Sequence, residues 1–230
     1  MGAHGESGRK VGLFGALAAI LVPISLYMVF VYAPTEATMG HVQRIFYYHV
    51  ATAWNAFLFF GAVAVCSGAY LYTRNERWNT AARTAGELGV LFTTLTLIAG
   101  SLWARPVWNV WWTWDPRLTT TLILWFIYVA YLLIQAGGES SERQKRFGAA
   151  FGIIGFLDIP LIHFSARLWR SIHPVVIQSD STGMPAEMFV TLMASVIAFT
   201  FLGLWLWERR FQLESLKERV EALRDRILPV

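Results

Sequence analysis

The pattern of apolar and polar positions divides the chain into six long apolar runs separated by short polar segments. The runs cover about residues 11–32, 47–72, 86–103, 118–136, 148–166 and 187–207. A helix that crosses a membrane needs roughly 20 mostly apolar residues, and each run is close to that length. We therefore predict an all-α integral membrane protein with six transmembrane helices.

The composition agrees with this class. Hydrophobic residues make up 56% of the chain and charged residues only 15%, with a mean hydropathy of +0.46, whereas charged residues make up about 25% of a soluble domain. The isoelectric point near 9.4 does not indicate a nucleic-acid partner, because the basic residues are scattered between apolar runs. The single cysteine, Cys66, excludes an intrachain disulfide, a Cys-x-x-Cys redox pair and a c-type haem attachment motif. We expect the first run to be a retained helix and not a cleaved signal peptide.

Lysine and arginine are distributed unequally between the two sets of polar segments. One set, which includes both termini, holds fourteen of them, and the other set holds five. Because cytoplasmic segments carry the excess of basic residues, both termini are predicted to be cytoplasmic. The outer, periplasmic segments are then about 33–46, 104–117 and 167–186.

The middle outer segment contains the most unusual stretch of the chain, with four indoles in ten residues: Trp108, Trp111, Trp112 and Trp114. Each indole offers a large flat apolar face with one N–H donor, so together they suit a planar apolar ligand. Asp115 and Pro116 predict a helix start after the loop, by capping and by the fixed φ of proline. Tryptophans at a helix end also anchor proteins in the headgroup region. Four of them followed by an acid and a base favour a binding surface that includes Asp115.

Histidines and arginines near the outer helix ends are candidates for the same site. His49 and His173 lie at or near these ends, and a neutral imidazole is the commonest side-chain ligand of haem iron. Arg44 and Arg117 present planar guanidinium groups that match carboxylates such as the haem propionates. The alternatives are hydrogen-bonded structural histidines and arginines that contact lipid phosphates.

Two other polar residues fall inside the fifth apolar run. Asp158 and His163 flank Pro160, which is expected to bend the helix by removing a hydrogen bond. Ionisable residues in a membrane span need partners within the bundle. We interpret the pair as a structural hydrogen-bond cluster, with a proton path as the alternative.

After Trp207 the chain becomes highly charged. Apolar residues recur there at intervals of three and four, which predicts an amphipathic helix in a cytoplasmic tail, residues 208–230, appended to a membrane domain, residues 1–207. The tail could lie on the inner membrane surface or dock to a partner subunit.

Several of these segments resemble one known family. Trp108–Thr119, Tyr48–Val50, Pro160–His163 and Ser171–His173 are similar to cytochrome c maturation protein C, also called haem exporter protein C. The similarity covers about residues 11–207, and its tryptophan-rich motif is highly specific. The family often has glycine after the first tryptophan, where this chain has Asn109. Asparagine tolerates a positive φ better than other non-glycine residues, so we expect the turn to be retained. The tail has no counterpart in the resemblance.

The resemblance implies a haem-binding protein of c-type cytochrome maturation in the bacterial cytoplasmic (inner) membrane. His49 and His173 would be axial ligands of the iron, and Trp108, Trp111, Trp112 and Trp114 the haem surface. The ligand would be iron protoporphyrin IX, held transiently and non-covalently on the periplasmic side. The implied partners are a CcmE-like periplasmic haem chaperone, which receives the haem, and ABC transporter subunits with a small membrane subunit.

Two other functions remain open from the residues themselves. A membrane b-type cytochrome would pass electrons, and is expected to place paired histidines well inside facing spans. A transporter would use the tryptophan-rich loop as an outer gate, and needs a polar track that Glu87, Asp158 and His163 supply only sparsely. The sequence favours a carrier and not an enzyme.

Overall fold

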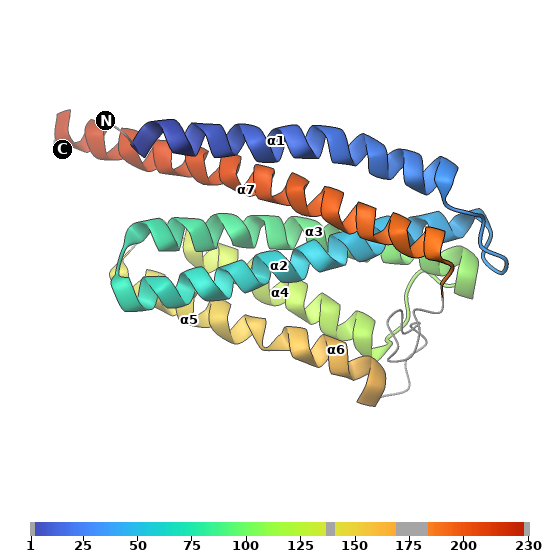
Figure 1. Ribbon diagram of the computed structural model, residues 1–230. Helices are drawn as coiled ribbons and strands as arrows, with labels where there is room; N and C mark the ends of the chain where they lie inside the picture. The colour runs from blue at the N-terminus through green and yellow to red at the C-terminus, as the bar shows by residue number, and fades with distance from the viewer. Residues whose placement is uncertain (1–2, 137–140, 169–183, 228–230) are drawn as a thin grey trace.

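The computed structural model describes residues 3–136, 141–168 and 184–227, and they form a bundle of long helices (Figure 1). The helices are α1 (Ala3–Tyr27), continued by a π-helical turn (Met28–Tyr32), a 3₁₀ turn (His41–Gln43), α2 (Arg44–Thr73), α3 (Glu76–Trp108), α4 (Pro116–Ala136), α5 (Glu142–Phe156), α6 (Asp158–Leu168) and α7 (Ala186–Ile227). Within the described residues, six helical segments are long and apolar enough to cross a membrane. The predicted fold class, an all-α multi-pass membrane protein, is confirmed.

Helices α2 and α3 form the centre of the bundle. They pack against each other over their length, with α1 and α7 side by side on one face and α4, α5 and α6 on the other (Figure 1). The N-terminal end of α1 and the C-terminal end of α7 lie at the same end of the bundle. An even number of crossings requires this arrangement. The side of the membrane on which these ends lie is predicted by the distribution of basic residues alone.

Close packing at the centre depends on small residues facing aromatic rings. The rings of Phe60 in α2 and Tyr128 in α4 are stacked with their centroids 3.7 Å apart. A Cβ atom on Gly89 of α3 would lie 2.3 Å from the ring of Phe60. Because any side chain at position 89 would overlap this ring, glycine there allows α3 to lie directly against α2.

The fifth apolar run is not one helix. Helix α5 ends at Phe156, and α6 begins at Asp158. The break precedes Pro160, which the sequence identified as the source of a bend. Pro160 lies in the first turn of α6, where its missing N–H has no intrahelical partner to lose. The predicted bend is therefore present, as an interruption of the helix at Leu157.

Helix α7 continues without a break across residue 207. Its 42 residues have a length of about 63 Å, roughly twice the thickness of the hydrocarbon core. The last part has an apolar stripe that is 56–74% exposed, formed by Leu213, Leu216, Val220, Leu223 and Ile227. The expected amphipathic helix is therefore present as an extension of the last span. Its separation as a tail domain remains a prediction.

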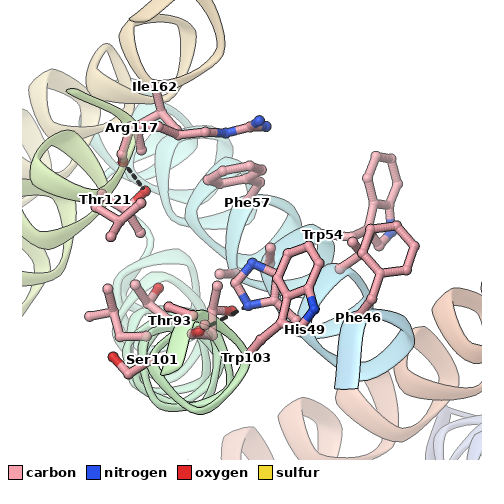
Figure 2. A pocket seen from close by; sticks show the side chains of 18 of the residues that line it. Phe46, His49, Trp54, Phe57, Thr93, Ser101, Trp103, Arg117, Thr121 and Ile162 are labelled. Carbon is pink, nitrogen blue, oxygen red and sulfur yellow. Dashed lines mark hydrogen bonds between the residues drawn. The ribbon is translucent and has the colours of Figure 1, made fainter. Parts of the chain in front are cut away.

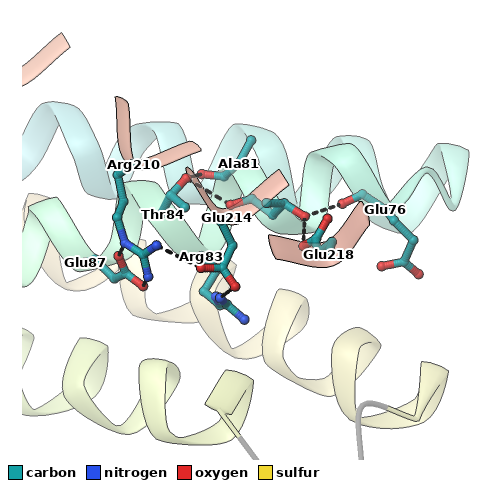
Figure 3. A network of polar contacts seen from close by, with 9 residues as sticks. Glu76, Ala81, Arg83, Thr84, Glu87, Arg210, Glu214 and Glu218 are labelled. Carbon is teal, nitrogen blue, oxygen red and sulfur yellow. Dashed lines mark hydrogen bonds and ion pairs between the residues drawn. The ribbon is translucent and has the colours of Figure 1, made fainter. Parts of the chain in front are cut away.

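A cluster of charged side chains joins this extension to α3 (Figure 3). The Arg210 guanidinium donates from Nε to Glu87 Oε2 at 2.5 Å and from Nη2 to Glu87 Oε1 at 2.9 Å. It also donates from Nη1 to Glu214 Oε2 at 2.8 Å, and Glu214 in turn pairs with Arg83. Farther along, Thr80 Oγ1 donates to Glu218 Oε1 at 2.7 Å.

Replacing Arg210 by alanine is expected to destabilise the protein by about 1–3 kcal/mol, because it removes charge-assisted hydrogen bonds from two carboxylates. The Glu214 side chain is only 6% exposed, so water replaces its lost hydrogen bond poorly. Thermal unfolding in detergent measures the effect. The control is Arg146→Ala, which breaks an i,i+4 pair with Glu142 whose side chains are 49% and 59% exposed. Equal destabilisation by both variants would contradict a structural role for the cluster.

Candidate functional site

A cavity of about 600 Å³ opens beside the α3–α4 connection (Figure 2). It is lined by side chains from α2, α3, α4, α6 and α7, most of them apolar. Its few polar or charged lining groups include His49, Arg117, His163 and several hydroxyls. Small-molecule sites have this character and volume, about 300–1,000 Å³ with a few placed polar groups.

His49 lies in the second turn of α2 and lines the cavity. Its Nδ1 is 3.1 Å from the main-chain oxygen of Thr96 in α3. Because a carbonyl oxygen only accepts, Nδ1 carries the proton in this contact, and Nε2 of the neutral ring carries the lone pair. Metal-binding histidines are oriented in this way, by a hydrogen bond from one ring nitrogen to a carbonyl oxygen.

Gly100 sets the position of this ring. A Cβ atom at position 100 would lie 3.0 Å from Cε1 and 3.4 Å from Nδ1 of His49. A larger residue would therefore require the imidazole to shift by a few tenths of an ångström, which disturbs its contact with the carbonyl of Thr96. Gly100 could not be singled out from the sequence, because its role depends on a contact between two helices.

An aromatic wall continues from His49 along the cavity. The Trp103 ring centroid is 6.1 Å from that of His49, 5.6 Å from that of Trp108 and 5.7 Å from that of Phe46. All four side chains line the cavity. Trp103 is 2% exposed and was not among the predicted site residues, because a tryptophan inside an apolar run resembles any other core residue.

The structure divides the four tryptophans of the motif into two pairs. Trp108 and Trp112 line the cavity, whereas Trp111 and Trp114 do not and are 58% and 76% exposed. The Arg105 guanidinium lies over the Trp111 ring, 5.9 Å from its centroid. The structure therefore brings two of the four predicted indoles to the cavity.

The connection between α3 and α4 is shorter than the expected segment 104–117. Helix α3 extends to Trp108 and ends at Asn109, whose φ of 58° is left-handed, so the expectation that asparagine retains this turn is confirmed. Helix α4 begins at Pro116, and Asp115 Oδ1 accepts a hydrogen bond from the Arg117 main-chain N–H at 2.9 Å. Asp115 is buried and caps this helix, as predicted.

The two predicted arginines lie in different places. Arg117 lines the cavity, and Figure 2 shows its guanidinium extending across it. No hydrogen bond or ion pair joins this guanidinium to another side chain in the described part of the chain. Arg44 does not line the cavity and lies over the Phe30 ring, 5.8 Å from its centroid.

The predictions for the two other histidines, His173 and His163, have different outcomes. His173, the second predicted iron ligand, lies outside the described residues. His163 of α6, which the sequence assigned to a structural cluster with Asp158, lines the same cavity as His49. Five residues separate Asp158 from His163, which places them about 140° apart around the helix. Among the described residues, no hydrogen bond or ion pair links His163 to Asp158 or to Glu87.

Together the fold and the cavity define a multi-pass membrane protein with imidazole, guanidinium and indole groups around one apolar cavity. Over residues 4–226 the chain matches the family described as heme exporter protein C, and it belongs to this family.

Three relatives illustrate the extent of the similarity. Heme exporter protein C of Bradyrhizobium diazoefficiens is 31% identical over 94% of this chain and 83% of the relative. The putative cytochrome c biosynthesis ccmC-like mitochondrial protein of Marchantia polymorpha is 34% identical over 84% of this chain and 80% of the relative. Heme exporter protein C of Escherichia coli K12 is 29% identical over 82% of this chain and 77% of the relative.

Proposed function

We propose that the cavity binds haem and that the protein presents it for the maturation of c-type cytochromes. The observation that carries the proposal is His49, whose Nδ1 is anchored by Thr96 so that Nε2 carries the lone pair in the cavity. The names of the relatives, which refer to haem export and cytochrome c biosynthesis, support it.

The residues around the cavity fit iron protoporphyrin IX as a non-covalently bound cargo. The iron accepts a neutral imidazole as a ligand, which His49 offers. The porphyrin requires flat apolar surfaces, and Trp108 and Trp112 supply them. The propionates require a bidentate cation, for which the Arg117 guanidinium is suited. We propose His173 as an outer axial ligand, on the resemblance alone.

We further propose that the site faces the periplasm and that the protein resides in the bacterial cytoplasmic membrane. It acts there as a carrier that passes haem to a periplasmic chaperone, beside the subunits of an ABC-type complex. The basic residues concentrated at the opposite end of the bundle support this orientation. The exposed Trp111 and Trp114 remain proposed parts of the outer surface near the haem.

A titration of the purified protein with haem, followed by its absorption spectrum, tests the binding step. We expect saturable binding of one haem per chain with the spectrum of a histidine-ligated iron. Metal-free protoporphyrin is the control, and it should bind more weakly because it lacks the bond to His49. Equal binding of both would contradict iron ligation, and no saturable binding of haem would overturn the proposed function.

A redox measurement distinguishes the proposed carrier from an electron-transferring b-type cytochrome. His49 and His163 both lie within spans, which is the feature expected of a b-type cytochrome. A b-type cytochrome would keep its haem and reduce it with quinol at a useful rate. A carrier would release its haem to an apo-acceptor without requiring quinol.

Gly100→Ala is expected to weaken haem binding about tenfold, because disturbing a group that orients a metal ligand costs about 10–100-fold in affinity. The variant should not unfold more easily, since alanine is favoured over glycine inside a helix by about 1 kcal/mol. The control is Gly68→Ala in α2, where a Cβ atom would meet nothing within 4 Å. Unchanged haem affinity in Gly100→Ala would show that the ring position does not matter.

A further inference from the structure

The apolar stripe on the last part of α7 has the spacing of a coiled-coil seam. Its residues recur at alternating intervals of three and four, which are the a and d positions of a heptad repeat. We call them the α7 seam: Leu213, Leu216, Val220, Leu223 and Ile227. All five are more than half exposed, and an open groove of about 540 Å³, bordered by Leu206 and Arg209, adjoins the first two. The described part of the chain therefore leaves the α7 seam uncovered.

The positions that flank the α7 seam carry positive charge and no negative charge. In a heptad these are the e and g positions, which set partner choice in helix pairs. Four of the five are basic, and the fifth is Gln212: Lys217, Arg219, Arg224 and Arg226. The four basic side chains are exposed and form no ion pair with the described residues. Two copies of this helix would therefore oppose base to base in either orientation, whereas a helix with acidic residues at these positions would be attracted.

The opposite side of the same helix is held against α3 (Figure 3). Glu214 pairs with Arg83 and accepts a hydrogen bond from Arg210. One turn later, Glu218 accepts a hydrogen bond from Thr80. Because these contacts fix the rotation of α7 about its axis, the two acids face α3 and the α7 seam with its basic flanks faces outward.

The direction of α7 carries the α7 seam away from the membrane. The helix runs from its span into this part without a break, and its C-terminal end extends past the α2–α3 turn (Figure 1). The apolar run of the span ends at Trp207, and Leu213 and Ile227 lie about 9 and 30 Å beyond it along the helix axis. The headgroup layer on one side of a bilayer is only about 5–8 Å thick. The α7 seam therefore does not lie flat in this layer, as an interfacial helix does.

We propose that the α7 seam binds an amphipathic helix of another protein, one with acidic residues on both sides of its apolar stripe. The apolar side chains of that helix pack between those of the α7 seam, and its carboxylates pair with the four flanking bases. Charge complementarity favours this partner over a second copy of the chain, and the direction of α7 favours it over lipid. The surface lies at the opposite end of the bundle from the cavity, so it is a second site of interaction.

The test titrates the full-length protein in detergent with two synthetic helical peptides. Both peptides have leucine at every a and d position, and they differ in having glutamate or lysine at every e and g position. We expect the glutamate peptide to bind, with an affinity that falls as the salt concentration rises, and the lysine peptide not to bind. The double variant Arg219→Glu, Arg224→Glu should bind the glutamate peptide about tenfold more weakly, because two attractive pairs become repulsive, and it should gain affinity for the lysine peptide.

A matched control is Arg77→Glu, Arg143→Glu, which reverses two exposed arginines at the same end of the bundle but outside the α7 seam and should leave both affinities unchanged. Equal affinity of the wild type for the two peptides, or no binding of the glutamate peptide, would overturn the proposal. A wild-type dimer that Leu216→Asp disperses would assign the α7 seam to a second copy instead.

A second measurement addresses lipid. An environment-sensitive fluorophore attached through Leu216→Cys should report contact with water in nanodiscs that contain anionic phosphatidylglycerol. Adding the glutamate peptide to the same labelled protein in detergent should shift its emission to the blue. Burial of the label in the nanodisc lipid without peptide would assign the α7 seam to the membrane and overturn the proposal.

Discussion

His49→Ala is expected to lower haem affinity by at least about 100-fold, the upper end of the cost of disturbing a group that only supports a metal ligand. The variant removes the iron ligand itself, and the contact with the Thr96 carbonyl is lost with it. Haem titration of the purified variant measures the affinity, and its spectrum reports the number of axial ligands. Added imidazole should partly restore the wild-type spectrum.

His41→Ala is the control for a general effect of losing a histidine. His41 is in the 3₁₀ turn before α2 and does not line the cavity, so its variant should bind haem as the wild type does. If His41→Ala lost haem while His49→Ala kept it, the ligand assignment would be wrong.

The second large effect is expected from the tryptophans that line the cavity. The double variant Trp108→Leu, Trp112→Leu should lower haem affinity about five- to 150-fold. Aromatic contacts are worth about 0.5–1.5 kcal/mol each beyond their buried area, so the loss of two costs about 1–3 kcal/mol. Affinity and the amount of protein in the membrane are measured side by side.

The chain offers a matched control in the same motif. The double variant Trp111→Leu, Trp114→Leu also removes two tryptophans, but from positions that do not line the cavity. An interfacial anchor would be weakened equally by either double variant, with loss of protein from the membrane and no specific loss of haem. Equal haem affinity of the two double variants would contradict the division of the motif.

The sequence predicted the features that depend on length and local chemistry. Six spans follow from apolar runs of sufficient length, and the start of α4 follows from Asp115 and Pro116. The turn at Asn109 follows from the tolerance of asparagine for positive φ. Each of these depends on a few consecutive residues, so no tertiary information was needed.

Features that depend on neighbouring helices were missed. Helical spacing alone could not separate Trp112 from Trp111, because the two lie in an irregular connection whose path is set by α3 and α4. That His163 lines the cavity could not be predicted, because it depends on how α6 packs against α4 after the break at Leu157. The cluster around Arg210 joins residues more than a hundred positions apart, so hydrophobic periodicity indicated an amphipathic tail but not its attachment to α3.

The most direct test of the central claim is an experimental structure of the protein loaded with haem. We predict iron bonded to Nε2 of His49, with the porphyrin inside the cavity beside Trp108 and Trp112 and a propionate at Arg117. A porphyrin bound outside the cavity on Trp111 and Trp114, with no bond between the iron and His49, would contradict the account.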